Sequence, residues 1–197
     1  EQKTVTSGET TFTLDRPFLV MATQNPVDQE GTYPLPEAQV DRFMLKVVIN
    51  YPTKDQEMEV MRRISNMQFN FTVNTILTKE DIFAIRDQVN KVKISESLER
   101  YIIELVYATR KPLEYKLNEQ AQYIQFGASP RASINLNLAS KAMAYMDGRD
   151  YVLREDIKEV AMDVMNHRII LNYEAEADNV KTTDIIKVLL MKVPISR

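Results

Sequence analysis

The sequence contains no cysteine, one histidine and four glycines. The absence of cysteine excludes disulfide bonds and thiolate metal sites, and is compatible with a reducing compartment. A lone histidine is poor support for a metal centre, so we predict no metal site. No apolar run approaches the roughly 18 residues of a membrane-spanning helix, and the polar first residues do not resemble a secretory signal peptide. We therefore expect a cytoplasmic protein.

An excess of charge of either sign is also missing. The formal net charge is −3, and 27% of the residues are charged against 44% that are apolar. This balance is ordinary for a soluble globular protein of one domain or two small ones. It argues against a bulk nucleic-acid binder, although a local basic patch stays possible.

The most informative stretch runs from Phe18 to Phe43. It opens with an apolar run, residues 18–22, whose lack of alternation suits a strand buried on both faces. The polar residues after it, up to Pro26, lie where open α/β sheets bind their ligands. A loop and a short helix over residues 37–42 follow, and residues 43–49 predict a second strand.

Two side chains of this stretch have chemistry suited to phosphates. The amide of Asn25 both donates and accepts hydrogen bonds, so it can orient a water or a phosphate oxygen. Arg42 presents a planar fork of donors that matches phosphate oxygens. The pattern alone favours a plainer interpretation, in which Asn25 starts a turn and Arg42 complements a helix dipole.

The segments ATQNP, EGTYPLPEAQ and DRF together resemble the sensor 1 to arginine-finger region of the MoxR family of AAA+ ATPases. The match is dense over about 26 residues, and departures such as Val27, Asp28 and Val40 alter no functional group. The resemblance implies that Asn25 is the sensor 1 residue, which aligns the attacking water. It implies that Arg42 is the arginine finger, which reaches the nucleotide of a neighbouring subunit and stabilises charge during phosphoryl transfer.

The same resemblance implies ATP and Mg²⁺ as cofactors of the complete protein. An ATPase of this class needs a GxxxxGK[ST] phosphate loop and an acidic strand for Mg²⁺. None of the four glycines lies in such a pattern, and the chain begins at Glu1 within what is expected to be a strand. We therefore interpret the sequence as an excised piece that binds no cofactor tightly and does not hydrolyse ATP alone.

The resemblance also implies partners. The complete protein is expected to form a homo-oligomeric ring, a hexamer, and to assist the maturation of client proteins, including von Willebrand A-type proteins. No nucleic-acid partner is expected. The alternative is a helical protein-interaction module that retains only degenerate ATPase ancestry.

A second motif lies farther along the chain. GASPRA places Ser129 as the N-cap of a helix, Pro130 at its first position and Arg131 in its first turn. A cation there opposes the helix dipole unless an anion sits at the same place. GASPRA resembles the sensor 2 motif of the family, which implies that Arg131 contacts nucleotide phosphates.

The fold class follows as an α/β remnant plus an all-α part. Residues 1–15 predict a β-hairpin whose role, partner contact or plain edge, is open. Residues 1–53 are expected to be the end of an AAA+ α/β core, and residues 54–197 a helical lid domain. Helical periodicity places apolar stripes along the lid helices; one of them is Ile134, Leu138, Ala142 and Tyr145.

Two remaining candidates receive structural interpretations. His167 is expected to be a cation that caps a helix C-terminus. The acidic residues Glu174, Glu176 and Asp178 lack the glycine and closing glutamate of a calcium loop, so we predict a solvated connector.

Overall fold

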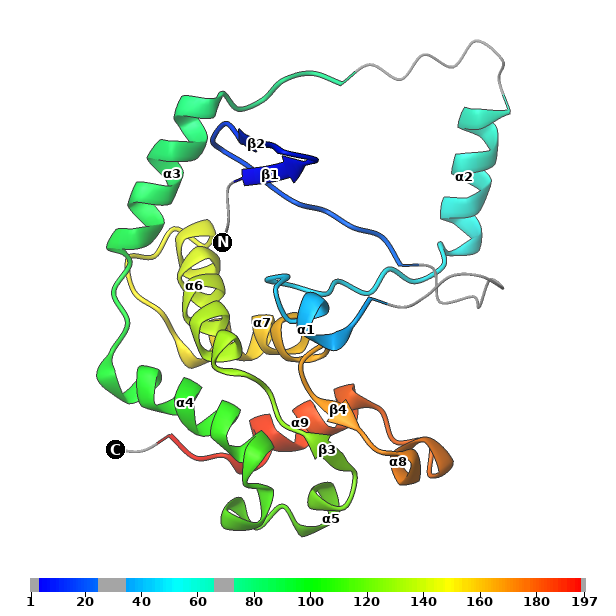
Figure 1. The fold of residues 1–197 in the computed structure, drawn as a ribbon, viewed down its shortest axis with the longest axis vertical. Helices are drawn as coiled ribbons and strands as arrows, with labels where there is room; N and C mark the ends of the chain where they lie inside the picture. The colour runs from blue at the N-terminus through cyan, green and yellow to red at the C-terminus, as the bar shows by residue number, and fades with distance from the viewer. Residues whose placement is uncertain (1–3, 25–34, 66–72, 196–197) are drawn as a thin grey trace.

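The computed structural model describes residues 4–24, 35–65 and 73–195. Figure 1 shows helices gathered around a common centre, with a hairpin and one helix standing apart from them. In chain order the elements are β1 (Thr4–Ser7), β2 (Thr10–Thr13), α1 (Glu37–Val40), α2 (Lys54–Ile64), α3 (Lys79–Lys91), α4 (Glu96–Arg110), η1 (Pro112–Tyr115), α5 (Asn118–Ala121), β3 (Ile124–Phe126), α6 (Pro130–Met146), α7 (Arg154–Met165), β4 (Ile170–Leu171), α8 (Tyr173–Ala177) and α9 (Thr182–Lys192).

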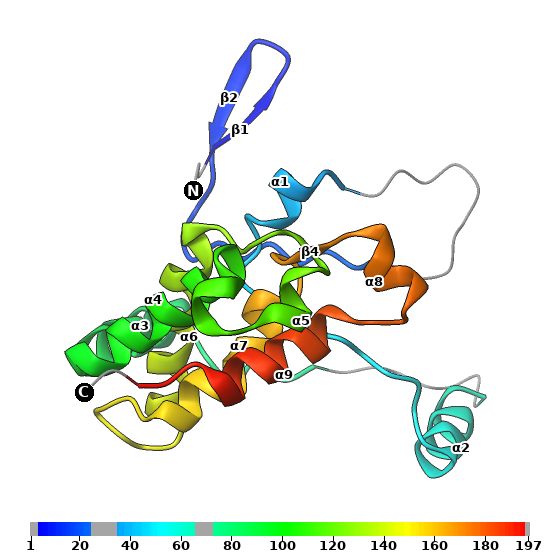
Figure 2. The same cartoon turned by 90° about the horizontal axis from the view of Figure 1, so that it is seen from below.

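The predicted N-terminal hairpin is confirmed. β1 and β2 pair antiparallel, with Thr4 opposite Thr13 and Ser7 opposite Thr10. The hydroxyls of Thr6 and Thr11 lie 3.0 Å apart across the strands, so a side-chain hydrogen bond reinforces the ladder. Figure 2 shows the hairpin projecting away from the helices.

The two strands predicted at residues 18–22 and 43–49 are absent. Both segments are irregular in the structure. Met21 is 85% exposed and Ile49 is 90% exposed, so neither run is buried. A strand of this kind needs neighbouring strands to bond its backbone and helices to cover its faces. Within the described parts of the chain, the paired strands are confined to two small two-stranded sheets.

The hydrophobic core lies among α4, α6, α7 and α9. Tyr101 and Leu105 of α4, Leu136 of α6, Ile157 of α7 and Leu189 of α9 are all fully buried. Figures 1 and 2 both show these helices packed together, with α3 extending the group on one side. The helical part therefore has a core of its own, as the amphipathic periodicity predicted.

The buried face of α6 differs from the predicted stripe. Ala132, Leu136 and Ala139 are buried, whereas Ile134 is 58% exposed and Leu138 is 43% exposed. α6 packs against both α4 and α7. Its small alanine side chains allow the helix axes to approach closely, which favours the alanine-rich face over the larger aliphatic one.

Helix α2 begins as predicted but packs differently from the lid helices. Thr53 and Gln56 form a capping box at its start. Its apolar side chains stay exposed, Met61 by 60% and Ile64 by 67%. Both views show α2 apart from the helical group. Among the described helices, none is long and apolar enough to cross a membrane.

The short elements between the long helices were not predicted. η1 and α5 follow α4, and β3 pairs antiparallel with β4. The predicted acidic connector is instead the helix α8, capped by Asn172, whose side chain accepts from the backbone N–H of Ala175 at 3.1 Å. Asp178, at its C-terminal end, accepts a hydrogen bond from Tyr123.

Gly127 lies where a side chain would collide with α4. A Cβ atom there would sit 2.5 Å from the carbonyl oxygen of Thr109 and 2.6 Å from its carbonyl carbon. Because these are backbone atoms, Gly127→Ala is expected to lower the free energy of unfolding by roughly 1–3 kcal/mol. Urea denaturation measures this change.

Gly148→Ala is the control for this prediction. Gly148 has φ of +74° but open space around it, so only the left-handed backbone opposes the alanine, at about 1 kcal/mol. Equal losses in the two variants would contradict a steric role for Gly127.

Candidate functional site

The first part of the site is the turn that follows α1. The backbone N–H of Asp41 donates to Glu37 at 2.9 Å, that of Arg42 to Gln39 at 3.2 Å, and that of Phe43 to Val40 at 3.1 Å. These bonds carry the helix into a tight turn, which presents the Asp41 and Arg42 side chains. Asp41 is partly buried and Arg42 is exposed.

The second part is the loop before α6. The backbone N–H of Ala128 donates to the hydroxyl of Thr109 at 2.9 Å, and Arg110 Nε donates to the Ala128 carbonyl at 2.7 Å. Together with the close approach of Gly127 to Thr109, these bonds fix the loop on the C-terminal end of α4. The start of α6 is therefore held in a defined position.

Ser129 is the N-cap of α6, as predicted. Its hydroxyl accepts from the backbone N–H of Arg131 at 3.2 Å, and its carbonyl accepts from that of Ala132 at 2.9 Å. Pro130 has no N–H to offer. Helix amides of this turn are thus already satisfied, so any anion bound here would depend on the Arg131 guanidinium.

The Asp41 carboxylate joins the two parts. The Ser129 hydroxyl donates to its two oxygens at 2.8 and 2.9 Å. Arg131 Nη1 donates to one of them at 3.1 Å and Arg168 Nε to the other at 3.1 Å. In the structure, a carboxylate of the same chain therefore lies beside Arg131.

Arg168 is the buried member of this cluster. Its side chain has no exposed surface, and it donates to the carbonyls of Asp41 at 3.0 Å and Met44 at 3.2 Å. It also donates to the carbonyls of Phe43 and Val164. A planar guanidinium with five donors suits this task, which a lysine could not perform. Arg168 thereby ties the turn after α1 to the end of α7.

His167 adds a further bond between the same elements. Its Nε2 lies 3.1 Å from the Phe43 carbonyl; because a carbonyl only accepts, Nε2 must carry the proton. Burial and the neighbouring charge of Arg168 lower the pKa of His167. The prediction of a capping cation is therefore wrong: the ring favours its neutral form and donates to the backbone.

The Asp41 carboxylate is stabilised in its ionised form. Burial acts to raise its pKa, but the hydrogen bonds from Ser129 and Arg131 and the charge of Arg168 outweigh this effect. The pKa of Asp41 accordingly lies below its usual range. Within the described residues, no group of three or more His, Asp or Glu side chains could hold a metal ion.

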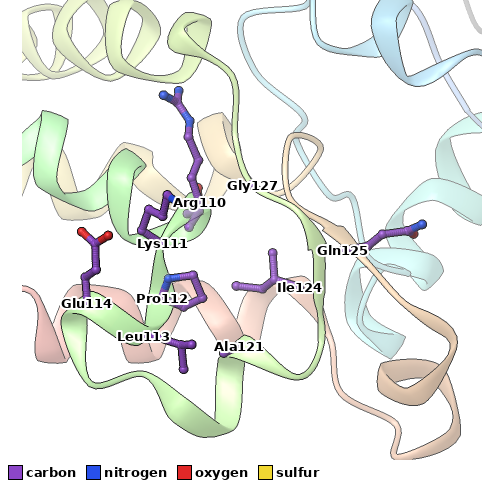
Figure 3. A pocket seen from close by; sticks show the side chains of 10 residues that line it. Arg110, Lys111, Pro112, Leu113, Glu114, Ala121, Ile124, Gln125 and Gly127 are labelled. Carbon is purple, nitrogen blue, oxygen red and sulfur yellow. The ribbon is translucent and has the colours of Figure 1, made fainter.

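A cavity of about 410 Å³ lies beside the loop before α6. Figure 3 shows that Pro112, Leu113 and Ile124 gather around it, while Arg110 and Gln125 extend away from these apolar side chains. Arg110 is engaged with the Ala128 carbonyl. Thr109, Lys111 and Glu114 also line the cavity, whereas no residue of the Asp41 cluster does.

Comparison of the chain with known proteins identifies its family. A model of the ATPase family associated with various cellular activities (AAA) matches residues 1–45, and an AAA lid domain model matches residues 117–188. The chaperone MoxR1 of Mycobacterium tuberculosis is 38% identical over 193 residues, which cover 98% of this chain and 51% of MoxR1. The chain belongs to the MoxR family of AAA+ ATPases.

Two further relatives agree with this membership. YeaC of Bacillus subtilis, an uncharacterised protein, is 38% identical over the whole chain and 59% of its own length. The crystal structure of an inferred ATPase of Cytophaga hutchinsonii is 64% identical, with a TM-score of 0.92 over 99% of this chain and 59% of that one. This MoxR chain thus spans about half the length of the curated relatives it matches. The expected fold class, an AAA+ α/β remnant followed by a helical lid, is confirmed.

The structure describes Arg42 and Arg131 of the predicted site residues of this MoxR chain, but not Asn25. Asn25 lies outside the described residues, so its role stays a prediction. Arg131 is brought to Asp41, the residue directly before Arg42. Sequence reasoning missed Asp41 and Arg168. Their only signal was position: Asp41 opens the DRF motif, and Arg168 follows the single histidine.

The two arginines bound to Asp41 should differ in their effect on stability. Arg168→Ala would leave a partly buried carboxylate and several carbonyls without their donor, at a cost of about 3 kcal/mol. The Arg131 side chain is 40% exposed, so Arg131→Ala is expected to cost about 1 kcal/mol or less. Urea denaturation of the chain distinguishes the two, and an equal loss would contradict the division.

The chain should lose stability on mild acidification. Because folding lowers the pKa of His167, the unfolded chain binds more protons once the pH falls below about 6.5, and the free energy of unfolding declines. The charges of Arg168 and Lys46 act to lower the pKa of His167 and so favour its neutral form, while the charge of Asp41 acts to raise it. Urea denaturation between about pH 7.5 and 5.5 measures the slope, since no second histidine titrates there.

His167→Gln is the control for this acid effect. Glutamine keeps an amide donor for the Phe43 carbonyl but has no proton to gain, so the slope should flatten. A slope unchanged in this variant would assign the acid sensitivity to other groups.

Proposed function

We propose that this chain is the C-terminal part of a MoxR-type ATPase that supplies two guanidinium groups to nucleotide phosphates held outside it. Arg42 acts as the arginine finger on a neighbouring subunit, and Arg131 acts as sensor 2. Hydrolysis is coupled to the chaperone-like maturation of partner proteins. In this proposal the boundary between the α/β core and the helical lid falls near residues 53 and 54.

The exposure of Arg42 carries this proposal. Its guanidinium is exposed and has no hydrogen-bond or ion-pair partner among the described residues, while the turn that bears it is fixed from behind by Asp41 and Arg168. An arginine that stabilises a transition state on another molecule needs this combination of a fixed base and an open head group.

The environment of Arg131 fits a phosphate. Its side chain is 40% exposed and lies in the first turn of a long helix. Guanidinium pairs readily with phosphate oxygens, and the Asp41 carboxylate already in contact with it shows that an anion is accommodated. The complete protein would bind ATP with Mg²⁺, as the family implies, through residues outside this chain.

The remaining roles follow from the same proposal. Asn25 acts as sensor 1 and aligns the attacking water. Since the chain has no GxxxxGK[ST] phosphate loop, it neither binds ATP tightly nor hydrolyses it alone. The complete protein forms a cytoplasmic homo-oligomeric ring, a hexamer, and serves client proteins that include von Willebrand A-type partners.

One observation favours a second function. Arg131 is paired within its own chain, as it would be if its contact with nucleotide had been lost. The chain would then be a helical interaction module with ATPase ancestry, and neither arginine would influence hydrolysis.

Steady-state ATPase kinetics on the complete protein separate these functions. Arg42→Ala is expected to lower kcat by about 10³-fold, the lower end of the range known for arginine fingers, with little change in KM. Arg131→Ala is expected to weaken ADP binding, which isothermal titration calorimetry measures directly.

Arg62→Ala is the matched control, since Arg62 is an exposed arginine on α2. If Arg42→Ala and Arg131→Ala show the kcat and ADP affinity of the wild type, as Arg62→Ala should, the ATPase proposal is overturned and the interaction module remains. Magnesium-dependent turnover by the pure 197-residue chain would contradict its expected inactivity.

A further inference from the structure

The donors around Asp41 are not equivalent. Arg168 has no exposed side-chain surface, whereas the Arg131 side chain is 40% exposed. The carboxylate itself is 16% exposed. Arg131 can therefore turn towards solvent or a ligand, while Arg168 cannot leave without stranding its charge in the protein interior.

Loss of Arg131 would leave the carboxylate well satisfied. Ser129 would still donate to both Asp41 oxygens and Arg168 to one of them. One charge of opposite sign would also remain beside the carboxylate. For Asp41, the cost of losing this part-exposed ion pair is thus small.

Asp41 also determines where the next residue lies. Arg168 donates to the side chain and to the carbonyl of Asp41, and to the carbonyl of Phe43. The carbonyls of the residues on both sides of Arg42 are therefore anchored to the end of α7. The backbone of Arg42 has little freedom to move, although its side chain is exposed.

We propose that Asp41 is a positioning residue that couples sensor 2 to the arginine finger within one subunit. Its carboxylate holds Arg131 until a nucleotide phosphate replaces it, and its anchorage by Arg168 keeps Arg42 aimed at the neighbouring subunit. This inference rests on the roles proposed above for Arg42 and Arg131. Asp41 touches no reacting atom and acts only through these two side chains.

The proposal predicts opposite effects on affinity and turnover when the Asp41 charge is removed. Asp41→Asn removes the Asp41 carboxylate that competes with phosphate for Arg131, so ADP should bind about two- to fivefold more tightly to the complete protein. The same change loosens the finger turn, so kcat should fall between about 10- and 100-fold. A simple loss of structure would weaken both properties together.

The experiment measures ADP affinity by calorimetry and kcat by steady-state assay in three backgrounds. These are Asp41→Asn, Arg131→Ala and the double variant. In the double variant the gain in ADP affinity should disappear, because it depends on Arg131. Glu59→Gln, which neutralises a carboxylate in the exposed Glu59–Arg63 pair of α2, is the matched control and should behave as wild type.

Each outcome decides the matter. Weaker or unchanged ADP binding in Asp41→Asn, or a gain that persists without Arg131, overturns the coupling. If Arg42→Ala and Arg131→Ala are themselves without effect, the proposed function fails first, and the two failures are thereby distinguished.

Asp41→Glu keeps the question answerable if Asp41→Asn does not fold. Glutamate retains the negative charge but moves the carboxylate by one methylene group. Turnover should then fall while ADP affinity stays at the wild-type value, because Arg131 still has a competing anion. Wild-type turnover in Asp41→Glu would refute a positioning role.

Discussion

The structure depends on one carboxylate that lies between two guanidinium groups. Residues 35–46 form no core of their own, and their apolar side chains are largely exposed. They are attached to the helical part by Asp41, by the donors of Arg168, and by the backbone bond from Lys46 to the Asp163 carbonyl at 2.8 Å. Polar contacts thus hold this segment in place, whereas hydrophobic packing holds α4, α6, α7 and α9 together. Polar contacts are directional, so they fix the orientation of a turn more closely than apolar contacts of the same area would.

Satisfied hydrogen-bond donors explain how two arginines can lie beside the single Asp41 carboxylate. A buried guanidinium is costly unless its hydrogen-bond donors are satisfied, and Arg168 meets this condition with four backbone carbonyls as well as Asp41. Burial lowers the pKa of Arg168, yet arginine stays protonated in proteins. The site therefore carries a permanent inner charge. Arg131 lies at its exposed edge and adds a second, part-exposed charge.

Local patterns predicted what is local in this fold. The hairpin and the N-cap at Ser129 both depend on residues within a few positions of one another, and both are confirmed. The segments at residues 18–22 and 43–49 were predicted as strands because their composition suits a buried sheet, but strands require pairing partners that the described residues do not supply. The face of α6 was misjudged because periodicity weighs size and ignores how closely a neighbouring helix approaches.

The candidate site was predictable only where a motif carried it. Arg42 and Arg131 were found because their motifs resemble those of a family, whereas nothing local distinguishes Asp41 or Arg168 from surface charges. Their importance is created by the fold, which brings the end of α7 against the turn after α1.

A guanidinium that serves another subunit must not be satisfied by its own, since an internal ion pair would compete with its target. The chain meets this requirement by bonding the residues on either side of Arg42 and leaving Arg42 itself exposed. The backbone of Arg42 is therefore held in place by the hydrogen bonds that Asp41 and Phe43 make. Under the role proposed for Arg42, any change that disturbs these neighbours would affect its guanidinium without contacting it.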